Sequence, residues 1–225
     1  MSHESRYLLK TKETKEINDR LKEQVLERAY RIMNQILYES DLKPWTEYIK
    51  ILNLRNDRLY PHSVDVALIS LMMGAELGYS DVILTDIGLG ALFHDIGKRL
   101  IPRRILKIPT ERSLEEEAIF RRHCILGVRY VSGSSLPENS RNIILQHHER
   151  MDGSGYPKRL TEERISEYAK IVMVADTFDY FTADIPSMEA AEALKVIKKE
   201  TRSYPQIYVN TLETVLNRFN STGRT

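Results

Sequence analysis

The stretch "ALFHDIGKRLIP", residues Ala91 to Pro102, ends an apolar run with an adjacent histidine and aspartate. Residues 82–95 fit a helical period of 3.6, so His94 and Asp95 are expected at the end of a helix. Neighbouring residues on a helix project about 100° apart, so both side chains can converge on a metal only if the helix end points into the site. Gly97 then lets the chain turn away.

The rest of the chain shows the same periodicity. From about residue 14 to 37, apolar residues recur at three- and four-residue steps between charged ones, which is typical of an amphipathic helix. Further segments that fit a helical period better than a period of two are 64–77, 114–131, 137–148, 165–181, 188–201 and 207–219. Glycine and proline mark the breaks between them. The sequence therefore predicts an all-α fold.

The apolar face of the amphipathic segment needs a partner, which is either the rest of the chain or a second copy. We interpret residues 1–45 as an N-terminal helical segment that serves as a linker or a dimerisation element. Residues 46–225 form the main domain in this interpretation, within the usual size of one domain. A homodimer through the N-terminal helix is one expected assembly.

Composition excludes several classes of partner. The 225 residues are 42% hydrophobic and 29% charged, with a formal net charge of +1. This balance gives no positive field for DNA, RNA or anionic lipid. No apolar run approaches the roughly 18 residues that span a bilayer, and the single cysteine, Cys124, cannot form an internal disulfide. We expect a cytoplasmic protein without membrane insertion.

The histidines carry the clearest chemical signal. A single histidine is more often a hydrogen-bonded structural residue, but several histidines combined with aspartates favour a metal site. A carboxylate can bridge two cations with its two oxygens, whereas an imidazole nitrogen binds one. Asp95 is the candidate bridge. The candidate ligands are His62, His94, Asp95, His123, His147, His148 and Asp176.

Two stretches, "HDIGK" from His94 and "HHERMDGSGYP" from His147, resemble the signatures of the HD-GYP family, a branch of the HD phosphohydrolases. Weaker matches follow in "HSVDV" from His62, "RRHCILG" around His123 and "KIVMVADTFDYFTAD" around Asp176. The resemblance covers roughly residues 51–218. It implies a helical bundle around two or three metal ions, usually iron or manganese, and hydrolysis of cyclic di-GMP, a bacterial signalling nucleotide, to pGpG or GMP.

The resemblance also implies roles for individual residues. One metal would be held by His62, His94, Asp95 and Asp176, and the second by His123, His147 and His148, with Asp95 bridging. The two cations would acidify a bridging water to a hydroxide that attacks the phosphorus. Lys98, which follows "HDIG", would contact a substrate phosphate, so Asp95 and Lys98 are the expected catalytic residues.

The loop that gives the family its name corresponds here to Asp152, Gly153, Gly155, Tyr156 and Pro157. In the family this loop is implicated in the architecture of the substrate site and in contacts with diguanylate cyclase (GGDEF) domains. A GGDEF-type or other signalling protein is therefore an expected partner. A purely structural turn is the alternative for Tyr156.

Two positions depart from the family pattern. Members with three metals carry a glutamate one helical turn before the first histidine, where this chain has Arg58. A cation there would repel a third metal, so the sequence predicts two divalent metal ions, with Arg58 either solvated or on a substrate phosphate. Family members commonly have arginine, proline and tyrosine after "FTAD", but this chain continues with Ile185, Ser187 and Met188 at the substrate-contacting places.

A basic run of residues 98–107 can compensate for the missing arginine, with Lys98 and Arg103 as substrate-binding candidates beside Arg58. A solvated face is the alternative for most of that run. The leading hypothesis is a cyclic di-GMP phosphodiesterase. The alternatives are a weakly active or inactive cyclic-dinucleotide receptor that acts as a protein-interaction module, and a phosphohydrolase of another phosphoester.

Overall fold

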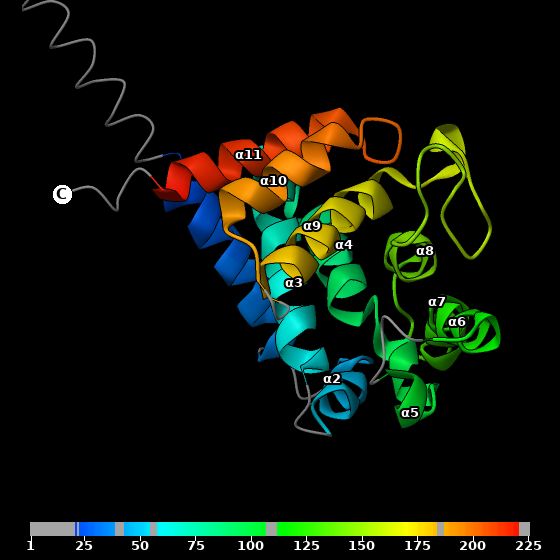
Figure 1. The fold of residues 1–225 in the computed structure, drawn as a ribbon. Coiled ribbons are helices and arrows are strands. Elements are labelled where there is room, and N and C mark those ends of the chain that lie inside the picture. Colours follow the sequence, from blue (N-terminus) through cyan, green and yellow to red (C-terminus); the bar gives the residue numbers. More distant parts are fainter. Residues whose placement is uncertain are drawn as a thin grey trace, which may run out of the picture.

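The computed structural model describes residues 21, 23–38, 43–54, 58–106, 112–183 and 187–220. In these ranges every regular element is a helix, which confirms the all-α prediction (Figure 1). The α-helices are α2 (Thr46–Asn53), α3 (Leu59–Glu76), α4 (Asp81–Phe93), α5 (Arg103–Leu106), α6 (Leu114–Arg121), α7 (His123–Tyr130), α8 (Glu138–Gln146), α9 (Glu167–Ala183), α10 (Ala190–Lys199) and α11 (Gln206–Asn220). Short 3₁₀ helices are η1 (Ile96–Leu100) and η2 (Glu162–Arg164).

The centre of the bundle consists of α3, α4 and α9, with α6, α7 and α8 on one side and α10 and α11 on another (Figure 1). Helix α4 is buried on almost every face from Ile87 to Phe93, as expected for a helix that is apolar all round. Its Gly90 lets α8 approach closely, because a Cβ there would lie 2.6 Å from Cδ1 of Ile143. The carboxyl end of α4 is thereby held deep in the core.

The described part of the N-terminal segment is helical over residues 23–37. Its apolar face lies in the same core as the rest of the chain, and Ile36 reaches the surface of α4 at Gly88. Arg28 and Arg31 both form ion pairs with Asp81, at 2.7 and 2.6 Å, in the first turn of α4. The buried residues are Val25, Ala29, Ile32, Met33 and Ile36. The predicted homodimer and the division at residue 45 stay predictions.

One predicted element is wrong. The periodicity over 114–131 predicts one helix, but the structure has two, α6 and α7, separated at Arg122. The break leaves the carbonyl of Phe120 available to the ring of His123, whose Nδ1 lies 2.8 Å away. Gly97 was expected to let the chain turn, but the structure requires glycine there because another backbone segment approaches closely. A Cβ there would lie 2.0 Å from the carbonyl oxygen of His123, so glycine allows η1 to pack against the break.

Among the described residues, no helix combines the length and the apolar composition that crossing a membrane requires. The cytoplasmic location stays a prediction.

Candidate metal centre

Three buried histidines stand where helices begin or end, and each is oriented by a backbone carbonyl three residues earlier. Carbonyls at a helix end lack their usual backbone partners, so a ring N–H can donate to them. The distances from Nδ1 are 2.6 Å for His94 to Ala91, 2.8 Å for His123 to Phe120 and 3.0 Å for His147 to Ile144. Since Nδ1 carries the proton in each neutral ring, the lone pair of Nε2 is directed into the site.

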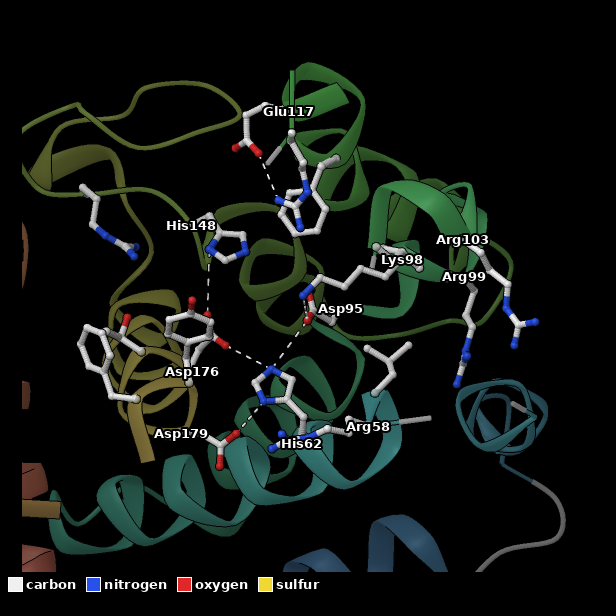
Figure 2. A pocket seen from close by; sticks show the side chains of 18 of the residues that line it. Arg58, His62, Asp95, Lys98, Arg99, Arg103, Glu117, His148, Asp176 and Asp179 are labelled. Atoms are coloured by element: carbon white, nitrogen blue, oxygen red, sulfur yellow. Dashed lines mark hydrogen bonds and ion pairs between the residues drawn. The ribbon is translucent and has the colours of Figure 1, made fainter. Parts of the chain in front are cut away.

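His62 is oriented by a carboxylate instead. It is the fourth residue of α3, and its Nδ1 lies 2.6 Å from Oδ2 of Asp179 on α9 (Figure 2). Asp179 stands one helical turn after Asp176, on the same face of α9. Sequence reasoning missed Asp179, although the three-residue spacing of the two acids in "ADTFD" was available as a signal. A carboxylate behind a histidine fixes the ring and makes it a stronger ligand.

Asp95 lies between two sets of histidines and turns one oxygen toward each. Its Oδ2 is 3.6 Å from Nε2 of His62 and 3.3 Å from Nε2 of His94. Its Oδ1 is 3.3 Å from Nε2 of His123 and 3.7 Å from Nε2 of His147. This is the arrangement that a carboxylate bridging two cations requires.

The remaining candidates complete two groups. Asp176 places Oδ1 3.2 Å from Nε2 of His62, and its Oδ2 is 3.9 Å from Nδ1 of His148. In each group, one donor atom per residue lies within 4.8 Å of all the others. The first group is His62, His94 and Asp176, and the second is Asp95, His123, His147 and His148. All seven predicted ligands are therefore close together.

The donor set fits metal ions better than it fits a hydrogen-bonded core. Nε2 of His62 faces Nε2 of His94 at 3.2 Å, and Nε2 of His123 faces Nε2 of His147 at 3.4 Å. Two lone pairs that face each other need a proton or a cation between them. Within the described part of the chain, Oδ1 of Asp95 is buried and has no hydrogen-bond donor. Nitrogen and carboxylate donors of this kind suit divalent first-row transition metals.

The electrostatics of the cluster also favour cations. Burial lowers the pKa of His94, but Asp95 and Asp176 outweigh burial and raise it to about 10. Burial raises the pKa of Asp95, yet Lys98 and His94 hold it well below its ordinary value. His123 meets no such excess of negative charge, and burial lowers its pKa to about 3. The two carboxylates thus stay ionised at neutral pH and attract positive charge to the centre.

A pocket of about 790 Å³ opens onto this cluster. Figure 2 shows Arg58 beside His62, Arg99 and Arg103 on another wall, and Glu117 on the side opposite Arg58. All three predicted substrate-binding residues line the pocket, as does Arg99 of the same basic run, whereas sequence reasoning gave Arg112 and Arg150 no role in the site. The basic residues that line it are Arg58, Lys98, Arg99, Arg103, Arg112 and Arg150. A lining with this many positive charges suits an anionic ligand.

Individual contacts place the predicted substrate-binding residues. Arg58, at the N-cap of α3, donates to the carbonyl of Ala183 at the end of α9 and so ties the two helices together beside the pocket. Lys98 forms an ion pair with Asp95, and its ammonium lies 5.3 Å from the ring centre of Phe120. Ile185, the second departure from the family pattern, lies outside the described residues.

The loop after α8 is closed around a buried carboxylate. Glu149 accepts backbone N–H groups from Lys158 and Leu160, at 2.7 and 2.9 Å. Gly153 has a φ of +75°, which glycine adopts at little cost. A Cβ on Gly155 would lie 2.4 Å from the backbone nitrogen of Arg150, so the two arms of the loop meet at a glycine. Glu149 was not among the predicted loop residues.

The same loop places Tyr156 beside the predicted metal ligands. The ring centre of Tyr156 lies 4.7 Å from that of His148. The guanidinium of Arg121 lies 4.9 Å from the centre of the same tyrosine ring. Asp152 accepts from the backbone N–H of Ser154 at 3.0 Å. The loop therefore contacts the second histidine group directly through Tyr156.

Comparison with known proteins gives matches over the domain that contains this cluster. A family model described as HD domain matches residues 47–205. A cyclic di-GMP phosphodiesterase of Thermotoga maritima is 40% identical over 146 residues, which are 62% of this chain and 40% of that protein. The 3'3'-cGAMP-specific phosphodiesterase 2 of Vibrio cholerae is 40% identical over 88 residues, which are 38% of this chain and 17% of that protein.

Among solved structures, Bd1817, an HDG"Y"P protein from Bdellovibrio bacteriovorus, has a similar fold, with a TM-score of 0.61. The similarity covers 88% of this chain and 70% of that one, at 22% sequence identity. The chain spans less than half the length of the two curated relatives.

Proposed function

Because this chain belongs to the HD-domain family and carries the sequence signatures of its HD-GYP branch, we propose that it is a metal-dependent phosphodiesterase. The substrate that we propose is cyclic di-GMP, and the products are pGpG or GMP. One observation carries the proposal, namely that Asp95 turns one carboxylate oxygen toward each of two histidine groups. The name of the Thermotoga relative supports the choice of substrate.

We assign His62, His94 and Asp176 to the first metal and His123, His147 and His148 to the second, with Asp95 shared. Two divalent ions, iron or manganese, would supply an acidified water and neutralise charge on the phosphoryl oxygens. The protein then need not provide a nucleophile of its own. Its residues instead orient the ligands, through carbonyls at helix ends and through Asp179.

The basic residues that line the pocket supply the contacts to the two phosphates of the substrate. Lys98, already beside Asp95, can donate to a phosphoryl oxygen close to the metal ligands. Arg58 and Arg103 line the same pocket and present planar guanidinium groups, which suit phosphate oxygens. Because Arg58 brings a positive charge next to His62, we propose two metals and not three.

Anaerobic incubation with cyclic di-GMP of protein loaded with iron(II) or manganese(II), followed by chromatography of the nucleotides, tests the proposal. The expected result is pGpG or GMP in the loaded sample and none after chelation. Asp95→Asn, which keeps the shape of the side chain but weakens its two metal contacts, is the matched variant and is expected to be inactive. Unchanged cyclic di-GMP with both metals verified by elemental analysis would refute the proposal.

The name of the Vibrio relative favours a second candidate substrate, the mixed dinucleotide 3'3'-cGAMP. The same assay with cyclic di-GMP, 3'3'-cGAMP and cyclic di-AMP in parallel ranks the candidates by kcat/KM. A GGDEF-type or other signalling partner and a homodimer through the N-terminal helix remain predictions.

A further inference from the structure

A second cluster of side chains lines the pocket away from the metal ligands, on α6 and just before it. The guanidinium of Arg112 lies 3.6 Å from the ring centre of Phe120. It is fixed there by two hydrogen bonds, from Nε to the carbonyl of Ile105 at 3.0 Å and from Nη1 to Oε2 of Glu117 at 3.1 Å. The side chain of Arg112 is only 10% exposed. Arg112 and Phe120 together form a shelf on the lining of the pocket.

The shelf adjoins the metal centre. The ring centre of Phe120 is 5.0 Å from that of His123, one of the predicted ligands. Phe120, Arg112 and Glu117 line the same pocket as His62 and Asp176. The Arg112 guanidinium lies over the Phe120 ring and both line the pocket, so a ligand would stack on the guanidinium face turned away from Phe120. Nucleobases stack on guanidinium planes as they do on aromatic rings.

Glu117 is unusual for this pocket. Of the acidic residues that line it, Asp95, Asp176 and Asp179 all contact histidines, and Glu117 does not. A carboxylate in a pocket for a dianionic ligand repels that ligand unless it meets hydrogen-bond donors. Glu117 is 32% exposed and is held by Arg112 at 3.1 Å and by Arg121 at 2.8 Å, which offset its charge. Arg112 donates to Oε2 and Arg121 to Oε1, so each oxygen keeps one further acceptor site, and the side chain lines the pocket.

Guanine offers the matching donors. Its Watson–Crick edge presents an N1–H and an N2–H₂ side by side, and one carboxylate can accept both. Adenine presents an acceptor, N1, at the first of these places and lacks the second donor. On the basis of the proposed function, we infer that Arg112 and Phe120 form a stacking shelf for a purine of the substrate, and that Glu117 selects guanine over adenine.

Glu117→Gln tests the inference, because it keeps the size of the side chain and replaces one acceptor by a donor. Helix α6 has no buried residues, so the change leaves the core intact. The probes are cyclic di-GMP and cyclic di-AMP for turnover, and their phosphorothioate analogues for calorimetric binding to manganese-loaded protein. Glu115→Gln is the matched control, since it removes the same charge from an exposed position on the same helix.

We expect Glu117→Gln to weaken binding of the cyclic di-GMP analogue about 10-fold or more, since a good bidentate contact to a base discriminates by that order. Binding of the cyclic di-AMP analogue and the metal content should stay unchanged, as should both affinities in Glu115→Gln. An equal loss for both ligands would mean that Glu117 only positions Arg112 and Arg121, and would overturn the inference. A wild-type preference for cyclic di-AMP would also overturn it.

The experiments can refute the guanine site and the phosphodiesterase activity independently of each other. Wild-type protein that hydrolyses cyclic di-GMP while Glu117→Gln keeps the same preference refutes the guanine site alone. Metal-loaded wild-type protein that turns over no cyclic dinucleotide refutes the phosphodiesterase. In that case a guanine preference in binding that depends on Glu117 still supports the recognition site.

Discussion

Replacing Asp179 by alanine should weaken the metal centre without removing a ligand. Asp179 contacts Nδ1 of His62 at 2.6 Å, and its side chain is 8% exposed. A hydrogen bond to a charged group of this kind contributes about 1.5–3 kcal/mol, which corresponds to a factor of roughly 10 to 150 in an equilibrium constant. Loss of a carboxylate behind a ligating histidine typically costs about 10- to 100-fold in metal affinity. The two estimates agree.

Competition between the manganese-loaded protein and a chelator of known affinity measures this effect. We expect Asp179→Ala to weaken binding at the first site within that range. Asp179→Asn should fall between alanine and wild type, because the amide oxygen still accepts from Nδ1 but carries no charge. The matched control is Asp65→Asn, an exposed acid one turn after His62 whose charge interacts with both His62 and Asp179.

The control separates orientation from bulk charge. If Asp65→Asn weakens metal binding as much as Asp179→Ala, the effect of Asp179 comes from its charge and the hydrogen bond has no special role. Wild-type affinity in Asp179→Ala would refute the reasoning altogether.

Three further changes follow from the same geometry. Asp95→Ala should lose both metals, as elemental analysis would show, since each histidine group uses one of its oxygens; a variant that keeps two metals would contradict a shared carboxylate. Gly97→Ala should lower the free energy of unfolding, measured in urea, by about 3 kcal/mol, because the new Cβ would lie 2.0 Å from the carbonyl oxygen of His123. Gly133→Ala is the control and should leave the free energy of unfolding unchanged, since its Cβ would meet only Tyr48 Oη, at 3.9 Å. Glu149→Gln turns an NH₂ toward a backbone N–H and should cost about 1–3 kcal/mol in the same measurement; unchanged stability would show that the loop does not depend on this carboxylate.

The sequence predicts the longer helices well because their apolar residues recur with a period of 3.6 residues, whereas the short helices α2 and α5 were not predicted. The segment 165–181 corresponds closely to α9 (Glu167–Ala183). Periodicity does not register the break at Arg122, because the apolar pattern continues through it. At the break, the ring of His123 and the backbone N–H of Arg122 compete for the carbonyl of Phe120. A pattern of side-chain polarity contains no information about that competition.

The candidate ligands could be predicted because they stand in two short signatures and three weaker matches, whereas the supporting residues could not. Glu149 stands inside a signature, but its role depends on two backbone N–H groups about ten residues further on. Arg112 and Phe120 belong to no motif, and they line the pocket through the packing of α6 on α7, which itself packs against η1. Tertiary contacts of this kind have no counterpart in local spacing.

The positions of the histidines follow from how each ring can be held. Inside a helix every carbonyl already accepts a backbone N–H, so a histidine there finds no free acceptor for Nδ1. His94 and His147 immediately follow the ends of α4 and α8, and His123 follows the break after α6, so each has an under-used carbonyl three residues earlier.

His62 stands near the start of α3, where the free backbone groups are N–H donors and cannot accept from the ring. It therefore requires an acceptor from another element, and Asp179 on α9 provides it. The helix ends hold the rings of His94 and His147, and the break at Arg122 holds the ring of His123. Together with His62, these rings direct four Nε2 lone pairs at Asp95 and Asp176. A substitution that extends α6 through Arg122 would be expected to disturb metal binding before it disturbs the core.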